Sequence, residues 1–182
     1  MITEIEILKF INAHRLVKAD TLLIFISSSA YFISAAVTFA LAIYGLARLQ
    51  PYFIRLFIFL FCSLSISTSI VCVLKYGINR IRPFIEDDAI VLLTSASSPS
   101  FPSGHTTTTM AIYFALSAYA NVPRKVSLLF LLWAVLVAYS RLALGAHYPS
   151  DVIVGILTAL LSVFVAKKLL SGSYLWSANH LS

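Results

Sequence analysis

The stretch TLLIFISSSAYFISAAVTFALAIYGLA, residues 21–47, decides the fold class because it runs for 27 residues without a charged side chain. A helix needs about 20 predominantly apolar residues to cross the hydrocarbon core of a bilayer. Four further stretches are also free of charge but shorter, namely residues 56–74, 106–123, 126–140 and 152–166. The two shortest reach the required length once their uncharged or snorkelling flanks are included. We therefore predict an all-α fold with five transmembrane helices, near residues 21–47, 53–74, 105–121, 125–141 and 149–167.

The composition agrees with a polytopic membrane protein. Hydrophobic residues make up 60% of the 182 positions and charged residues 11%, against roughly 45–50% and about 25% in ordinary globular chains. A soluble chain of this size has too small an interior for so much apolar surface. The net charge of +6 is spread along the chain without a basic run, so nucleic acid is not an expected partner. We find no internal repeat and predict one membrane-embedded domain over residues 1–182.

The charges divide unequally between the two ends of the predicted helices. One end carries basic residues and no acidic residue, namely Arg48, Arg55, Arg124, Lys125, Lys167 and Lys168. The other end carries seven basic and seven acidic residues, so the whole excess lies at the first end. The positive-inside rule assigns the basic end to the cytoplasm. We therefore expect a cytoplasmic C-terminus and a polar end that faces the exterior. The lack of a signal-peptide pattern and the short apolar cores favour a bacterial inner membrane.

Residues 1–20 mix apolar side chains with Glu4, Glu6, Lys9 and Arg15. This pattern predicts a helix that lies in the membrane interface. A short disordered tail and a sixth span are the alternatives. The segment does not resemble a signal peptide, because acidic residues stand where the basic start would be. Cys62 and Cys72 lie about 15 Å apart along one helix, so we interpret both as packing residues.

Three polar clusters interrupt the apolar pattern. They read Lys75-Tyr-Gly-Ile-Asn-Arg-Ile-Arg82-Pro83, Pro102-Ser103-Gly104-His105 and Ser140-Arg141-Leu-Ala-Leu-Gly-Ala-His147-Tyr-Pro-Ser-Asp151. The topology drawn from charge places all three at the exterior end of the helices. Residues far apart in the sequence can therefore converge on one site.

The first candidate role of these clusters is to bind an anion. Lys75, Arg82 and Arg141 are three cations, and guanidinium groups match phosphate oxygens in a bidentate manner. Ser103 and Gly104 precede a predicted helix, whose first N–H groups are free to bind an anion. Together these residues predict a phosphate site.

The second candidate role is nucleophilic catalysis. His147 and Asp151 are four residues apart, so the carboxylate can hold one imidazole nitrogen protonated and leave the other free to attack. His105 can protonate the leaving oxygen. A single His or Arg at the end of a span is usually an ordinary interfacial residue. We give that interpretation to His14, His180, Arg80 and the acidic run 86–88; for Arg80 and the acidic run, the alternative is that they touch the substrate or tune the site.

With these residues in place, the sequence resembles the type 2 phosphatidic acid phosphatase (PAP2) family. The family's signature is Lys, six residues, Arg-Pro; then Pro-Ser-Gly-His; then Ser-Arg, five residues, His, three residues, Asp. Every position of the signature is filled here, including the supporting Pro83, Pro102 and Ser140. The resemblance spans roughly residues 10–168.

The resemblance implies a helical core shared with vanadium haloperoxidases and glucose-6-phosphatase. It implies a phosphohistidine on His147 oriented by Asp151, with His105 as acid and then base. It implies that Lys75, Arg82, Ser103, Gly104 and Arg141 hold the phosphoryl oxygens, with no metal and no cofactor. Many members have six spans where we count five.

The predicted function is hydrolysis of a lipid phosphate or diphosphate at the exterior face of the membrane. Candidate substrates are undecaprenyl diphosphate, phosphatidylglycerophosphate, phosphatidic acid and a lipid A phosphate, and we favour the first. Transfer of the phosphoryl group to a second lipid would use the same histidine. Two alternatives remain. A vanadate-dependent haloperoxidase is disfavoured by the membrane embedding. A lipid binder or transporter without turnover is disfavoured by the complete catalytic set.

Overall fold

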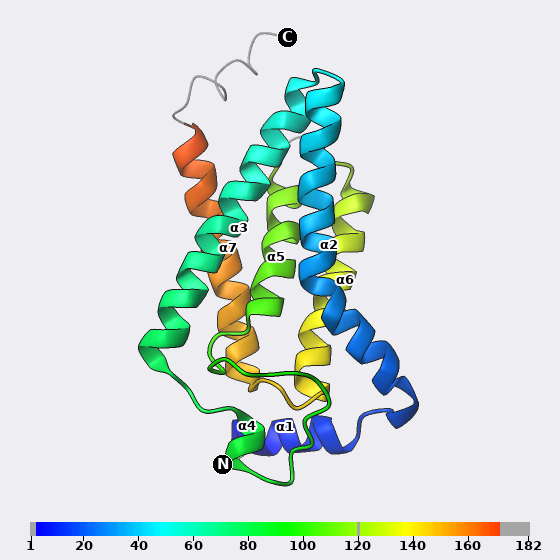
Figure 1. Cartoon of the computed structure of the whole chain (residues 1–182), viewed down its shortest axis with the longest axis vertical. Coiled ribbons are helices and arrows are strands. Elements are labelled where there is room, and N and C mark those ends of the chain that lie inside the picture. The colour runs from blue at the N-terminus through cyan, green and yellow to red at the C-terminus, as the bar shows by residue number, and fades with distance from the viewer. Residues whose placement is uncertain (1–2, 120, 172–182) are drawn as a thin grey trace.

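Five helices run side by side along the long axis of the molecule (Figure 1). They are α2 (Asp20–Ala47), α3 (Pro51–Ile78), α5 (Gly104–Ala118), α6 (Arg124–Ala143) and α7 (Pro149–Ser171). The computed structural model describes residues 3–119 and 121–171, and over these residues all regular structure is helical. The predicted all-α fold is therefore confirmed.

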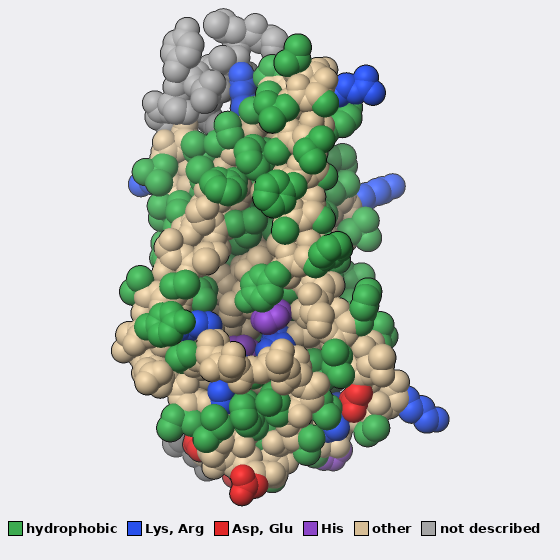
Figure 2. All heavy atoms as spheres, viewed as in Figure 1, with side chains coloured by type: hydrophobic (Ala, Val, Ile, Leu, Met, Phe, Trp, Pro, Cys, Tyr) green, Lys and Arg blue, Asp and Glu red, His purple; other side chains and the backbone are tan. Residues whose placement is uncertain are grey.

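Four helical segments are long and apolar enough to cross a membrane, namely Val17–Ala47, Pro51–Glu86, Arg124–Ala143 and Pro149–Ser171. Many of their large apolar side chains are exposed on the outside of the bundle, and Figure 2 shows hydrophobic side chains over most of the visible face. An outer surface of this kind suits a hydrocarbon solvent. The chain is therefore an integral membrane protein.

Helix α5 differs from the span predicted near residues 105–121. It has 15 residues, about 22 Å at 1.5 Å per residue, and is too short to count among the spans. It contacts α2, α3, α6 and α7, and nine of its residues are buried. A helix that faces protein on most sides needs no lipid-facing apolar belt, which explains its lower apolar content.

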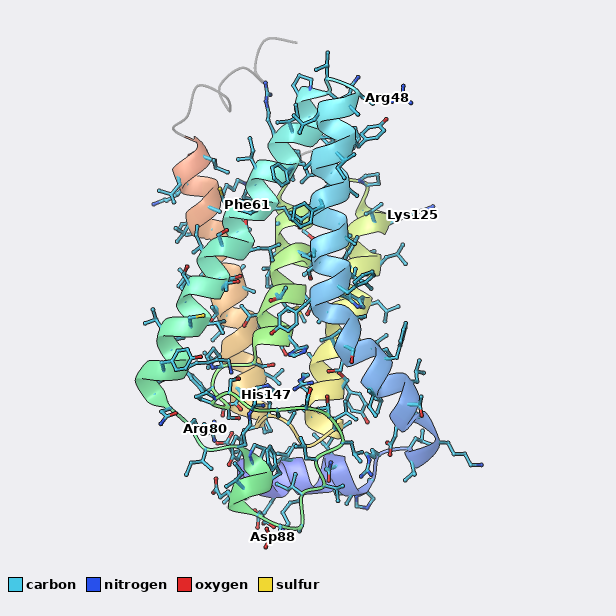
Figure 3. The ribbon with its side chains drawn as sticks, viewed as in Figure 1. Arg48, Phe61, Arg80, Asp88, Lys125 and His147 are labelled. Atoms are coloured by element: carbon cyan, nitrogen blue, oxygen red, sulfur yellow. The ribbon has the colours of Figure 1, made fainter. Side chains whose placement is uncertain are left out.

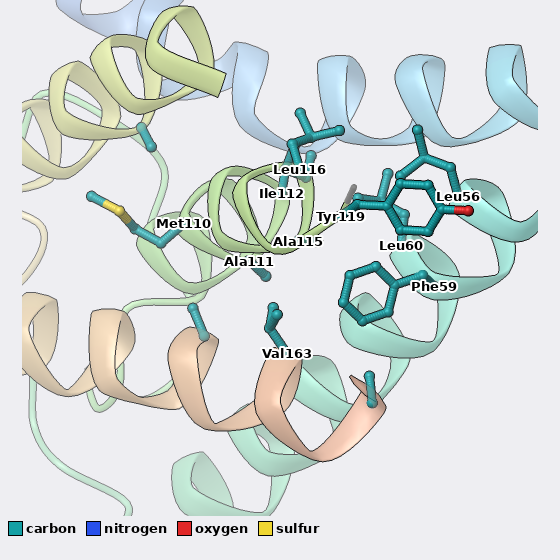
Figure 4. Packing of buried hydrophobic residues seen from close by; sticks show 13 residues of the cluster. Leu56, Phe59, Leu60, Met110, Ala111, Ile112, Ala115, Leu116, Tyr119 and Val163 are labelled. Carbon is teal, nitrogen blue, oxygen red and sulfur yellow. The ribbon is translucent and has the colours of Figure 1, made fainter. Parts of the chain in front are cut away.

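The main hydrophobic core surrounds α5 at the middle of the bundle (Figure 4). Met110, Ile112 and Leu116 on α5 are buried there, together with Phe59 and Leu60 on α3. Small residues such as Ala111 and Ala115 face the neighbouring helices without exposure, and small side chains allow membrane helices to approach closely. This core packs the later part of α5 against α3, α6 and α7.

Helix α1 (Glu4–Ala13) lies across that same end, beside the short helix α4 (Pro83–Glu86) (Figure 1). Thr3 and Glu6 form a capping box that starts α1. The buried side-chain amide of Asn12 donates to the carbonyls of Val91 and Ala143 at 3.0 and 2.8 Å. These contacts attach α1 to the end of α6, and the short 3-10 helix η1 (Val17–Ala19) then leads into α2.

Candidate active site

The three polar clusters meet around one cavity of about 220 Å³ at this end of the bundle. Arg48 and Lys125 lie toward the opposite end, whereas Arg80, Asp88 and His147 gather at this one (Figure 3). Figure 2 shows histidine and Lys/Arg side chains in a hollow on the same face. The lining residues are Tyr31, Lys75, Arg82, Ser95, Ala96, Ser97, Ser98, Gly104, His105, Arg141 and His147.

Local backbone geometry brings each cluster to the cavity. Helix α3 ends at Ile78, and the left-handed φ of 50° at its C-cap, Asn79, turns the chain after Lys75 toward Arg82. Helix α6 ends near Arg141, and Gly145 follows with a φ of +71°. A Cβ at Gly145 would lie 2.6 Å from the carbonyl oxygen of Val91. This position therefore requires glycine for both conformation and space, and the turn carries His147 over the end of α6.

His147 and Asp151 form the predicted pair. His147 Nδ1 lies 3.3 Å from Asp151 Oδ2. The same oxygen accepts hydrogen bonds from the backbone N–H of Tyr148 at 3.0 Å and from the hydroxyl of Ser100. Asp151 is fully buried in the first turn of α7, where a carboxylate is favoured by the helix dipole. The carboxylate is thus fixed while its partner's ring faces the cavity.

Arg82 lies beside the other nitrogen of His147. Its Nη1 is 3.2 Å from His147 Nε2 and donates to the carbonyl of Ala146 at 2.6 Å, while Nε donates to the carbonyl of Ser98 at 2.8 Å. Arg82 is 6% exposed. A guanidinium held by two carbonyls keeps one edge directed at Nε2 of His147, where it could stabilise the charge of a bound anion.

Arg141 and Lys75 contribute two further cations. Arg141 is 2% exposed, its Nη1 donates to Ser27 Oγ at 2.5 Å, and its Nε has no hydrogen-bond partner among the described residues. Lys75 Nζ donates to the carbonyl of Pro99 at 2.5 Å. An unpaired N–H on a buried cation is costly unless a ligand completes it. This open donor, in a cavity with three cations, favours an anionic ligand.

The start of α5 supplies Gly104 and His105. A Cβ at Gly104 would lie 2.9 Å from the hydroxyl of Tyr31, so glycine lets the α2 tyrosine close over the helix terminus. The rings of Tyr31 and His105 pack with centroids 4.5 Å apart. The first N–H groups of α5 have no acceptor within the helix. The helix terminus therefore adds donors beside His105.

Four other predicted residues take structural positions. Ser103 is buried, does not line the cavity, and pairs its hydroxyl with Thr106 at 2.9 Å. Ser140 donates to the carbonyl of Val137 in its own helix. Pro83 starts α4 and Pro102 follows a cis peptide bond. A direct role for Ser103 at the phosphate remains a prediction.

Several residues remain outside the cavity. Exposed His14 bonds the carbonyl of Phe10, and Glu86 accepts from the Tyr148 hydroxyl. Asp87 pairs with Lys9 at 2.8 Å. Arg80 lies behind Asp151 rather than in the cavity. His180 is outside the described residues.

The sequence interpretation missed Tyr31 and Ser98, which line the cavity, and Ser100, which donates to Asp151. The only signal was the polar run Ser-Ala-Ser-Ser-Pro-Ser at residues 95–100 before the Pro-Ser-Gly-His cluster. Serine and tyrosine are common at membrane interfaces, so their type alone carries little information.

The environment keeps His147 neutral. Burial lowers the pKa of His147 to about 3, and the positive charges of Arg82 and Arg141 act in the same direction against the hydrogen bond to Asp151. A neutral imidazole retains a lone pair on the nitrogen that faces the cavity. The site therefore combines a neutral imidazole with a free lone pair, a buried carboxylate beside it, a second histidine and three cations.

Comparison with known proteins places this arrangement in a family context. The model of the PAP2 superfamily matches residues 55–174. The undecaprenyl-diphosphatase BcrC of Bacillus subtilis is 28% identical over 162 residues, which cover 88% of this chain and 80% of that protein. An undecaprenyl-diphosphatase of Sulfolobus acidocaldarius is 30% identical over 155 residues, covering 83% and 70%. The crystal structure of Aquifex aeolicus LpxE matches with a TM-score of 0.75 at 25% identity, covering 92% and 99%.

Proposed function

Because the chain belongs to the PAP2 superfamily and is a membrane lipid phosphatase of that type, we propose that it hydrolyses the diphosphate head group of a polyprenyl lipid, with undecaprenyl diphosphate as the preferred substrate. Two relatives matched over most of their length carry the name undecaprenyl-diphosphatase. The connection at residues 87–103 is short and builds no separate domain that would select a soluble substrate. A lipid head group fits a cavity at the end of a membrane bundle.

The observation that carries the proposal is the position of His147 at a cavity with three cations. Nε2 of His147 attacks the terminal phosphorus, and the bond from phosphorus to the bridging oxygen breaks. His105 donates a proton to that leaving oxygen, which departs as the lipid monophosphate. Asp151 accepts the Nδ1–H of His147 and stabilises the positive charge of the phosphorylated ring.

Water completes the cycle in the second step. His105 takes a proton from a water molecule, whose oxygen attacks the phosphohistidine, and the P–N bond breaks to release inorganic phosphate. Lys75, Arg82 and Arg141 hold the phosphoryl oxygens through both steps, since phosphoryl transfer depends mainly on positioning and charge stabilisation. Ser103 and Gly104, at the N-terminus of α5, add backbone N–H donors to this phosphate site.

We further propose that the cavity faces the exterior of an inner membrane and that α5 is the fifth crossing. The basic residues at the other end favour a cytoplasmic location for that end. Helix α5 runs from the cavity toward that end between α3 and α6 (Figure 1), so the chain needs it to return. Helix α1, across the outer end, then lies at the level of the lipid head groups.

The test is phosphate release from undecaprenyl diphosphate by the detergent-solubilised chain, in the presence of a chelator. We expect release by the wild type, no measurable release by His147→Ala, and unchanged release by His14→Ala. Faster turnover of phosphatidylglycerophosphate, phosphatidic acid or a lipid A phosphate would reassign the substrate. Full activity of His147→Ala would contradict the phosphohistidine mechanism.

A further inference from the structure

Arg80 lies behind the catalytic pair and contacts it from outside the cavity. Its Nη1 donates to Asp151 Oδ1 at 2.9 Å and to Ser150 Oγ at 2.7 Å. Its guanidinium carbon lies 3.7 Å from the centre of the Tyr148 ring. The face of the guanidinium therefore packs on the Tyr148 ring, and its edge donates to two residues in the first turn of α7.

The opposite end of the guanidinium is held by helix α1. Nη2 of Arg80 donates to Glu4 Oε1 at 2.5 Å. The second oxygen of Glu4 accepts from the hydroxyl of Ser150 at 2.6 Å and from its backbone N–H at 3.3 Å. Hydrogen bonds from Ser150 and Arg80 outweigh partial burial and lower the pKa of Glu4. Glu4 is therefore ionised near neutral pH. Glu4 and Arg80 form an ion pair, and both also bond Ser150, next to Asp151.

Each oxygen of the Asp151 carboxylate has its own partners. Oδ2 faces His147, the Tyr148 N–H and the Ser100 hydroxyl, whereas Oδ1 accepts from Arg80. Rotation of the carboxylate would break the bonds on both sides together. Arg80 therefore helps to fix the plane and the position of the carboxylate that faces the histidine.

We propose that Arg80 is a positioning residue that fixes the Asp151 carboxylate for His147, and that Glu4 makes helix α1 part of this support. The inference rests on the proposed function, because it takes His147 as the nucleophile. We do not assign Arg80 as a phosphate ligand, because it does not line the cavity and both of its Nη atoms donate elsewhere, to Asp151, Ser150 and Glu4.

The positive charge of Arg80 also offsets part of the negative charge that Asp151 presents to His147. The charged and titratable groups that face this pair are Arg80, Glu4, Tyr148, Lys75, Arg82, Arg141 and His105. Without Arg80, the whole carboxylate charge acts on the imidazole. The pKa of His147 then rises, and protonation blocks the nucleophile at a higher pH than in the wild type.

The experiment compares kcat, KM and the pH profile of kcat/KM for undecaprenyl diphosphate hydrolysis. Arg80→Ala should lose about 10- to 100-fold in kcat, the range seen when partners that orient metal ligands are removed, with KM changed less than threefold. The acid limb of its pH profile should move upward by about half a unit or more. Arg80→Lys should recover part of the kcat that Arg80→Ala loses, because a single ammonium can bond either Asp151 or Glu4 but cannot bridge the two carboxylates. Glu4→Gln should lose less than Arg80→Ala, and the double variant should be no worse than Arg80→Ala.

Lys9→Ala is the matched control. Lys9 also ties α1 to the bundle end through Asp87, but it has no contact with Arg80 or Asp151, so its kcat and pH profile should match the wild type. Wild-type kcat and an unmoved acid limb in Arg80→Ala and Arg80→Lys would overturn the inference, provided that His147→Ala is inactive. Additive losses in the double variant would overturn the part assigned to Glu4. Activity in His147→Ala would instead overturn the proposed function.

Discussion

The Nε2 atom of His147 lies 3.2 Å from Nη1 of Arg82, and this contact selects the tautomer of the histidine. A guanidinium has only donors, so Nε2 must hold a lone pair and the ring proton must lie on Nδ1, facing Asp151 at 3.3 Å. Under the proposed mechanism, the resting histidine therefore already carries its lone pair on the attacking nitrogen. A phosphate oxygen that accepts from the same Arg82 N–H would compete with Nε2 for that donor and leave Nε2 free to attack.

Removal of the Ser100 hydroxyl should weaken the catalytic pair. Ser100 is fully buried and donates to Asp151 Oδ2, and a hydrogen bond to a charged group contributes about 1.5–3 kcal/mol. We expect Ser100→Ala to reduce kcat about 10-fold and to lower the melting temperature. Ser69→Ala, at an exposed serine that bonds within α3, is the control. Equal behaviour of the two variants would rule out this role for Ser100.

Replacement of Arg141 by lysine should be damaging although the charge is kept. The unpaired Nε–H of Arg141 and its bond to Ser27 depend on the planar guanidinium. We expect Arg141→Lys to reduce kcat/KM about 100-fold and to weaken inhibition by inorganic phosphate. The same exchange at exposed Arg124, at the start of α6, should have no effect. Wild-type kinetics in Arg141→Lys would remove this residue from the phosphate cradle.

The role of His105 is tested by the leaving group. A general acid matters most when the departing oxygen is strongly basic. His105→Ala should therefore lose about 10²–10⁴-fold with the lipid diphosphate and much less with p-nitrophenyl phosphate, whose leaving group needs little protonation. Rates of phosphate release for both substrates give the comparison. A loss of the same size on both would contradict the acid role.

Acid should destabilise the folded chain through His147. Its pKa is about 3 in the structure, against 6.5 for an ordinary histidine. Between these values the unfolded chain binds a proton that the folded chain does not, so stability falls as pH decreases through this window. We expect the melting temperature in detergent to fall between pH 7 and pH 5, and to fall less in His147→Gln. An identical decrease in both proteins would show that His147 does not contribute.

The orientation is tested by thiol labelling. Ser97 lines the cavity and Ser171 ends α7 at the other end of the bundle, and both are exposed. In a background without the free Cys62 and Cys72, an impermeant reagent on intact cells should label Ser97→Cys and not Ser171→Cys. Labelling in lysed cells controls for reactivity. The reverse pattern would place the cavity at the cytoplasmic face.

Much of the site could be predicted because charged residues are conspicuous in an apolar chain. Lys75, Arg82, His105, Arg141 and His147 line one cavity although up to 72 positions separate them. The sequence could not assign the partners of Asp151, because hydrogen bonds depend on side-chain directions that spacing does not determine. It therefore treated Arg80 as an ordinary interfacial residue, whereas the structure places its guanidinium against the buried carboxylate.

The helices too could be predicted only in part from the sequence. Runs without charge located α2 and α3 well, since both face lipid on one side and must be apolar for most of their length. The length of α5 could not be predicted in this way, because hydropathy does not distinguish a lipid-facing helix from one enclosed by other helices. Ser103 is a similar case: its type suits a phosphate contact, but its hydroxyl is paired with Thr106.

The enclosure of α5 has a consequence for biosynthesis. Thr106, Thr107 and Thr109 are buried against neighbouring helices in the native fold, but on a nascent chain these hydroxyls would meet lipid. A short segment with such residues partitions poorly into a bilayer by itself. We expect the insertion machinery to retain α5 until α6 emerges, so that the start of the helix that carries His105 becomes ordered late, when α6 and then α7 assemble around it.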